Sequence, residues 1–79
     1  MQVKLTIQEY NILKTGPFIE KIDSIFWAND SCKISISSEV ADEIRDWAGG
    51  QLQLIGFDKS WELTPIGNVL ESLIDKMYA

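Results

Sequence analysis

Side chains that commonly carry out chemistry are scarce in this sequence. It contains no histidine and a single cysteine, Cys32. Without histidine, Ser-His-Asp and Cys-His nucleophilic arrangements are excluded, and the commonest metal ligand is missing. Only Lys33 stands beside Cys32 to favour a reactive thiolate, so we expect Cys32 to be a small apolar filler. The sequence therefore predicts no enzyme, no cofactor and no metal site.

Acidic residues recur at helical spacing in the second half of the chain. Glu39, Asp42, Glu43 and Asp46, which we call the acidic series, stand at i, i+3, i+4 and i+7. This spacing places the four carboxylates along one face of a helix. Carboxylates on one straight helix cannot surround a calcium ion, which takes about six to eight oxygen ligands. The acidic series is either a solvated face or a surface for a basic partner protein, and both interpretations stay open.

Trp27 is the tryptophan that best fits a partner contact. It follows Phe26 directly, so the two side chains can hardly both face a core. Exposed tryptophan is enriched at the centres of protein interfaces. Trp47, by contrast, continues the apolar stripe of its helix. Trp61 alternates with Leu63, so we expect its side chain to point inward.

The charge of the chain is unevenly distributed. Residues 1–37 contain four basic and four acidic residues, whereas residues 38–79 contain three basic and eight acidic residues, which accounts for the net charge of −5. Proteins bind phosphate backbones mainly through Lys and Arg. We therefore expect no nucleic acid partner, and a basic protein is the partner that this charge fits best.

The N-terminus and the hydropathy pattern bear on the compartment. Residues 1–6 lack the long apolar core of a signal peptide. No apolar run approaches the roughly 20 residues that cross a bilayer. A lone cysteine also fits a reducing compartment. We expect a cytoplasmic protein of bacterial type without membrane contact.

The N-terminal residues predict a strand followed by a helix. Val3 and Leu5 alternate with polar neighbours, as in a short strand. Thr6 and Glu9 have the spacing of a capping box, which predicts a helix from near residue 7. The buried face of this helix would carry Ile7, Tyr10 and Leu13.

The middle of the chain allows two interpretations. Gly16-Pro17 ends the first helix. The apolar residues that follow have helical spacing: Phe18, Ile22, Ile25 and Phe26. Alternatively, residues 25–28 form a strand that turns at residues 29–30. Residues 33–37 alternate cleanly between apolar and polar, so we expect a strand there.

A long helix is expected after this strand. Ser37 or Ser38 can cap it, and we expect it to run to Ile55 and to stop at Gly56. Two glycines, at positions 49 and 50, weaken a helix interior. For this reason residues 51–55 could instead form a strand.

The last helix has a Thr-Pro start. After a turn at residues 58–60, Thr64 caps the helix and Pro65 takes its first position. Its apolar stripe consists of Ile66, Val69, Leu70, Leu73, Ile74 and Met77. Together, the elements predict the α+β class, with three or four helices packed on a two- or three-stranded antiparallel sheet. We expect residues 1–79 to form one small, helix-rich globular domain.

Residues 54–74 resemble the wing and the final helix of winged-helix domains. Residues 54–57 (LIGF), a tight turn, residues 61–64 (WELT) and the last helix carry the resemblance. The family implies a recognition helix before the wing and a basic wing. Here the preceding helix carries the acidic series, and Lys59 in the turn stands against Asp58 and Glu62. We expect these residues to repel DNA.

We therefore predict a small acidic protein-interaction domain, adaptor or inhibitor-like, without catalytic activity. Trp27 and the acidic series are the predicted partner contacts. The alternative is a winged-helix-like DNA-binding regulator, whose contacts would come from the neutral first half or from a dimer. The sequence does not identify the partner protein. It is also compatible with a homodimer.

Overall fold

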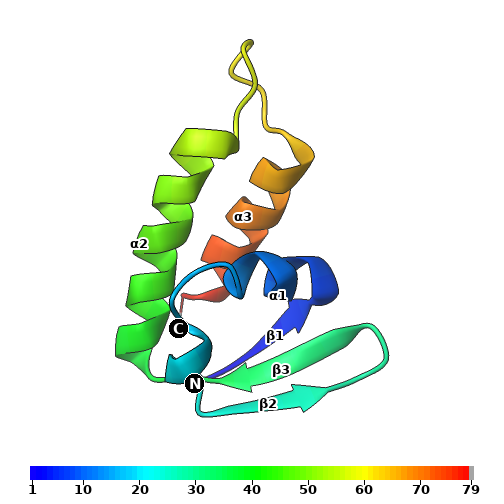
Figure 1. Cartoon of the computed structure of the whole chain (residues 1–79), viewed down its shortest axis with the longest axis vertical. Helices are drawn as coiled ribbons and strands as arrows, with labels where there is room; N and C mark the ends of the chain where they lie inside the picture. Colours follow the sequence, from blue (N-terminus) through cyan, green and yellow to red (C-terminus); the bar gives the residue numbers. More distant parts are fainter. Residues whose placement is uncertain (79) are drawn as a thin grey trace.

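A computed structural model describes residues 1–78, and within them three α-helices and a three-stranded antiparallel sheet form an α+β fold (Figure 1). This agrees with the predicted class. The elements in chain order are β1 (Gln2–Thr6), α1 (Ile7–Leu13), a single 3-10 turn η1 (Ile19–Lys21), β2 (Ser24–Trp27), β3 (Ser31–Ser35), α2 (Ser38–Ile55) and α3 (Pro65–Lys76).

The sheet has the order β1-β3-β2, so β3 lies in the centre and β2 forms one edge. One row across the sheet places Val3 beside Ile34 and Ile34 beside Ile25. The helices cover the face that carries these apolar residues (Figure 1). The neighbouring row places Lys4 beside Lys33 and Lys33 beside Phe26, on the opposite face. That face is open to solvent, and we call it the open face.

The core lies between the sheet and the helices. Its members come from the sheet, from all three α-helices and from segments next to them: Val3, Leu5, Leu13, Phe18, Cys32, Ile34, Ile36, Ala41, Ile44, Ala48, Leu70, Leu73 and Met77. Cys32 is buried among these residues, and burial first, then the nearby Glu9 carboxylate, raises the pKa of its thiol. A buried thiol of this kind is a filler, as predicted.

The helix boundaries follow the predicted capping signals. Thr6 and Glu9 form the reciprocal capping box of α1. The Ser37 side chain accepts a hydrogen bond from the Val40 backbone N–H at 3.2 Å and so starts α2. α2 continues through both glycines to Ile55, so the alternative strand at residues 51–55 is wrong. The Thr64 side chain accepts from the Gly67 N–H at 3.0 Å, with Pro65 in the first position of α3.

Two predictions in the first half need correction. Residues 24–27 form the strand β2, so the helical interpretation of this segment is wrong. The spacing looked helical because it combined the short turn η1 with the start of a strand. Ile7 is exposed rather than buried, because α1 turns Glu9 and Leu13 toward the core. The central strand also begins and ends two residues earlier than expected, at Ser31–Ser35.

The end of α2 and the start of α3 approach each other at two glycines. A Cβ atom added to Gly67 would overlap the backbone carbonyl of Gly56. The Gly56 carbonyl also accepts a hydrogen bond from the Thr64 N–H at 2.8 Å. The absence of a side chain at Gly67 therefore allows the two helix ends to close and to direct the connecting segment outward.

No helix within residues 1–78 combines the length and the apolar character that a membrane span requires.

Candidate interaction surface

The segment between α2 and α3 forms a hairpin that projects from the end of the helix pair (Figure 1). Phe57 and Leu63 form a bridge at its base. The Asp58 N–H donates to the Glu62 carbonyl at 2.9 Å, and the Trp61 N–H donates to the Asp58 carbonyl at 3.0 Å. The Asp58 carboxylate accepts two further backbone N–H groups, from Ser60 at 2.8 Å and from Glu62 at 3.1 Å. These bonds define one conformation for the turn.

Trp61 occupies an unusual backbone conformation in this turn. Its φ is 62°, the one positive φ of a non-glycine residue within residues 1–78. For a residue with a Cβ atom, this left-handed conformation costs roughly 1–2 kcal/mol. The prediction that Trp61 points inward is wrong, since the residue is 80% exposed. A left-handed residue interrupts the alternation of a strand, so the spacing to Leu63 no longer predicts the direction of the side chain.

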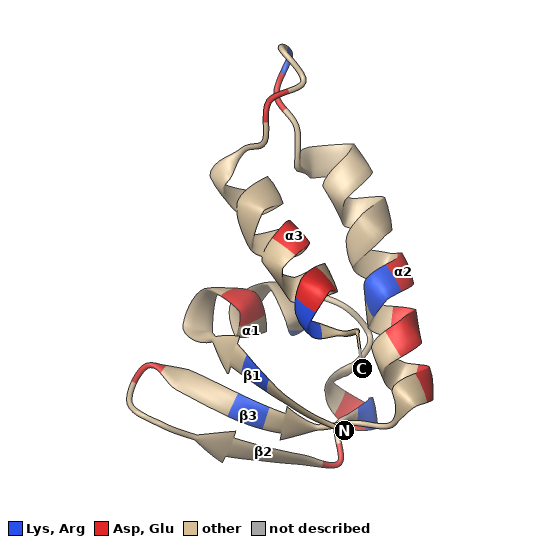
Figure 2. Ribbon diagram, turned by 180° about the vertical axis from the view of Figure 1, so that it is seen from behind, with Lys and Arg blue, Asp and Glu red and all other residues tan. Residues whose placement is uncertain are grey.

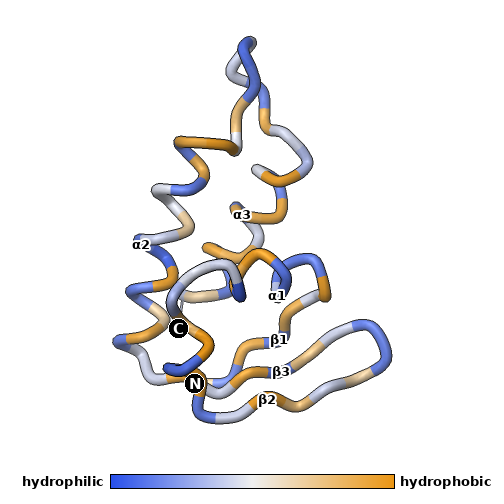
Figure 3. Tube along the Cα trace, in the orientation of Figure 1, coloured by the Kyte–Doolittle hydropathy of each residue, from blue (hydrophilic) through white to orange (hydrophobic). Residues whose placement is uncertain are grey.

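Other apolar side chains are exposed at the same end of the molecule. Leu54, in the last turn of α2, is 77% exposed, and Ile55 and Ile66 are about half exposed. Figure 3 shows this apolar last turn of α2 next to the hairpin. The ring of Phe57 lies 6.3 Å from the ring of Trp61. We call these five residues, Leu54, Ile55, Phe57, Trp61 and Ile66, the hairpin-end surface. Exposed apolar residues that gather at one end of a molecule are a candidate interaction surface, whereas singly scattered ones need no explanation.

A shallow groove continues this surface along α1. It has a volume of about 300 Å³ and lies between α1 and the first turns of α3. Its lining is mostly apolar: Gln8, Asn11, Ile12, Pro65, Ile66 and Val69. Ile66 belongs to both the groove and the hairpin-end surface, so a partner that contacts the hairpin can extend into the groove.

The strain at Trp61 leads to a prediction about stability. We expect Trp61→Gly to be more stable than Trp61→Ala by about 1 kcal/mol, because both variants lose the ring but only glycine adopts a positive φ without cost. Chemical denaturation of the two variants measures this difference. Equal stabilities, or a more stable alanine variant, would show that the left-handed conformation carries no strain.

The acidic series lies on the outer side of the N-terminal half of α2, where its residues are exposed (Figure 2). Two of its members are engaged in ion pairs. Glu43 pairs with Lys21 at 2.6 Å, and Asp42 pairs with Arg45 one turn along the helix. For Glu39 and Asp46, no ion pair is found within residues 1–78. Two members of the acidic series are therefore paired locally, and the other two, Glu39 and Asp46, are exposed.

Trp27 is the last residue of β2 and is 54% exposed. Its ring packs edge-on against Tyr10, with the ring centroids 4.9 Å apart. Phe26, on the open face, is more exposed at 74%. Figures 1 and 2 show β2 running away from α2, so Trp27 and the acidic series do not form one continuous site.

A buried carboxylate, Glu9, joins α1 to α3, a contact that the sequence did not reveal. Glu9 is only 2% exposed. Its Oε1 accepts hydrogen bonds from the Lys76 ammonium at 2.5 Å and the Thr6 N–H at 2.8 Å, and its Oε2 accepts one from the Ser72 hydroxyl at 2.8 Å. Burial raises the pKa of Glu9, but the bonds from Lys76, Thr6 and Ser72 and the Lys76 charge outweigh burial, so the pKa lies below its usual value.

The Glu9 cluster is structural in character. All of its buried polar atoms within the described chain have partners. No group of three or more His, Cys, Asp or Glu side chains among residues 1–78 is placed to hold a metal ion. The hydrogen bonds from Ser72 and Lys76 to Glu9 therefore connect α3 to α1.

Comparisons with protein-family models, curated proteins and solved structures found no match to this chain.

Proposed function

We propose that this chain is a non-catalytic protein-interaction domain that binds its partner through the hairpin-end surface. The proposal rests on the exposure and the backbone conformation of Trp61. It is held exposed, in a conformation that favours glycine, by a turn whose backbone is fixed by the Asp58 carboxylate. Strained residues of this kind concentrate at functional positions, because the strain brings no benefit to folding. Tryptophan is also the residue most enriched among interface hot spots.

The residues of the hairpin-end surface and the charge of the chain suggest which groups the binding site of the partner contains. Trp61, Leu54 and Ile66 need an apolar pocket to remove them from water. The residues from 38 onward carry the whole net charge of −5. Glu39 and Asp46 on α2 would attract a basic partner at long range and speed its encounter. We therefore propose a partner with an apolar pocket that is surrounded by basic residues, in an adaptor-like or inhibitor-like complex.

We propose no role in binding nucleic acid. A hairpin that acted as a wing would need basic residues to contact phosphates. This hairpin carries Lys59 between Asp58 and Glu62, and the acidic series lies on the preceding helix. The likeness to winged-helix domains is therefore limited to the order of helix, hairpin and helix.

Affinity capture from the native cell, with parent and variant chains side by side, tests the proposal. We expect a partner that is retained by the parent chain and lost with Trp61→Gly, a variant that suits the turn and so leaves the fold intact. Trp27→Ala is the matched control, because it removes an exposed tryptophan from β2, at a distance from the hairpin. A partner lost with Trp27→Ala and retained by Trp61→Gly would place the anchor on β2 and overturn the proposal.

A further inference from the structure

The outer edge of β2 carries no charged residue and no proline, the residue types that often protect an edge strand. Proteins guard such edges with lysine, proline or bulges, because an unpaired edge can pair with another strand. β2 reads Ser24-Ile25-Phe26-Trp27, without charge or proline, and no other strand within residues 1–78 pairs with its outer edge. β1, the opposite edge strand, carries Lys4 at its centre. The edge formed by β2 is therefore the less protected of the two edges of the sheet.

The pairing of β2 with β3 determines which backbone groups point outward. The Ala28 N–H donates to the Ser31 carbonyl at 2.8 Å, which makes these residues a hydrogen-bonded pair. Such pairs alternate along an antiparallel ladder, so Phe26 bonds to its neighbour Lys33. The N–H and C=O groups of Ile25 and Trp27 therefore point away from β3, toward the open edge.

We propose that β2 pairs with β2 of a second copy of this chain, antiparallel and about a two-fold axis at Phe26. In this register Ile25 of each copy faces Trp27 of the other. Each facing pair makes two backbone bonds, which satisfies all the outward groups of Ile25 and Trp27. The two Phe26 residues form a close, non-hydrogen-bonded pair, and the two sheets join into one continuous sheet.

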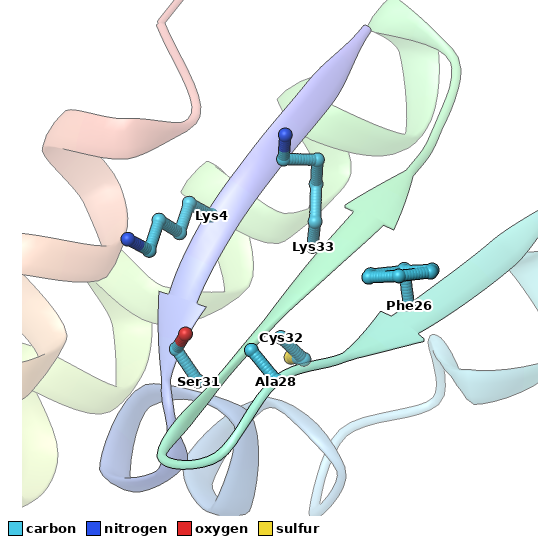
Figure 4. A pocket seen from close by; sticks show the side chains of 6 residues that line it. All are labelled: Lys4, Phe26, Ala28, Ser31, Cys32 and Lys33. Atoms are coloured by element: carbon cyan, nitrogen blue, oxygen red, sulfur yellow. The ribbon is translucent and has the colours of Figure 1, made fainter.

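The side chains suit this register on both faces of the sheet. Phe26 projects from the open face, in the row that it shares with Lys33 and Lys4 (Figure 4). Facing aromatic pairs of this kind stabilise antiparallel strands. On the other face, Trp27 is held by Tyr10 and would lie beside Ile25 of the second copy. No like charges meet within the paired segment, since β2 carries no charged residue.

A second copy fits this edge because its own β2 is equally uncharged and apolar, so no charge is buried and the two exposed Phe26 rings cover each other. One two-fold axis brings both outward-pointing residues and the aromatic residue into matching positions at once, as an isologous contact requires. β2 has only four residues, so the contact is short and the dimer weak. The hairpin lies at the opposite end of the long axis (Figure 1), so the dimer and the proposed partner can bind independently.

Sedimentation velocity from micromolar to near-millimolar concentration tests the proposal. We expect the parent chain to shift from monomer to dimer as the concentration rises. Phe26→Lys should stay monomeric, because it places two ammonium groups opposite each other at the axis. Phe26 is largely exposed, so the substitution spares the core. Gln2→Lys is the matched control: it adds the same charge to β1, the other edge strand, and should dimerise like the parent.

Amide hydrogen exchange gives a second readout that does not need a variant. The amides of Ile25 and Trp27 should become protected as the concentration rises, whereas the amide of Phe26, bonded to β3, should be protected throughout. A parent chain that stays monomeric over the whole range would overturn the proposal. So would dimerisation of Phe26→Lys like the parent, or protection of Ile25 and Trp27 at every concentration.

Discussion

Leu70→Ala is expected to lower the free energy of unfolding by about 2–5 kcal/mol, because it removes buried apolar contacts and leaves a cavity in the core. Leu70 lies on α3 and is a fully buried member of the core. A domain of this length is stable by only roughly 4–12 kcal/mol. The variant should therefore lose a large share of its stability and melt well below the parent chain.

Ile66→Ala is the control for this prediction. Ile66 lies on the same helix but is about half exposed at the hairpin. Its truncation to alanine should therefore lower the free energy of unfolding much less than Leu70→Ala does. Thermal melting of the three chains gives the comparison. If Leu70→Ala melts within about a degree or two of the parent, the stripe on α3 is not the core that the structure describes.

Lys76→Met is expected to destabilise the chain by about 1.5–3 kcal/mol at neutral pH, because it removes a charged hydrogen bond from a buried carboxylate. The pKa of Glu9 is lower in the folded chain than its usual 4.5. The ionised carboxylate therefore contributes stability near neutral pH, and this contribution disappears as the pH falls below 4.5 and through the folded value. The difference between parent and Lys76→Met should shrink over the same pH interval.

Chemical denaturation of the parent and Lys76→Met, from neutral pH down to about pH 3, measures this difference. Lys14→Met removes the same charge from an exposed position and should change stability little at any pH. A difference for Lys76→Met that stays constant over this range would mean that the charge of Glu9 does not hold α3 against α1.

The helix starts could be predicted because their causes are local. The capping box at Thr6, the serine before α2 and the Thr-Pro start of α3 each involve residues within about three positions of one another. The acidic series was placed on one helical face for the same reason. Its ion pair with Lys21 was not foreseen, since Lys21 lies 22 positions before Glu43 in the chain.

The contacts of Glu9 could not be read from the sequence. Its capping role depends on Thr6, three residues away, but Ser72 and Lys76 lie 63 and 67 positions further along. Only the folded chain brings α1 and α3 together. A polar residue on an otherwise apolar helix face is the signal that could have indicated a buried cluster.

The direction of Trp61 was mispredicted for a different physical reason. Alternation assumes that each residue of a strand is extended, and a single left-handed residue breaks that rule. The sequence Asp58-Lys59-Ser60 did predict a turn, but glycine is the usual residue at a left-handed turn position. Because tryptophan stands there instead, the sequence alone did not reveal that the side chain of Trp61 is exposed.

The affinity of the captured partner for the parent chain and for Trp61→Gly is the most direct test of the hairpin-end surface as the binding site. Calorimetric titration of both chains, each shown to be folded, provides the measurement. We predict that Trp61→Gly binds about thirtyfold more weakly, the loss expected for a hot-spot residue worth about 2 kcal/mol. Equal affinity for the two folded chains would contradict the account, because Trp61 would then be exposed and strained without contacting the partner.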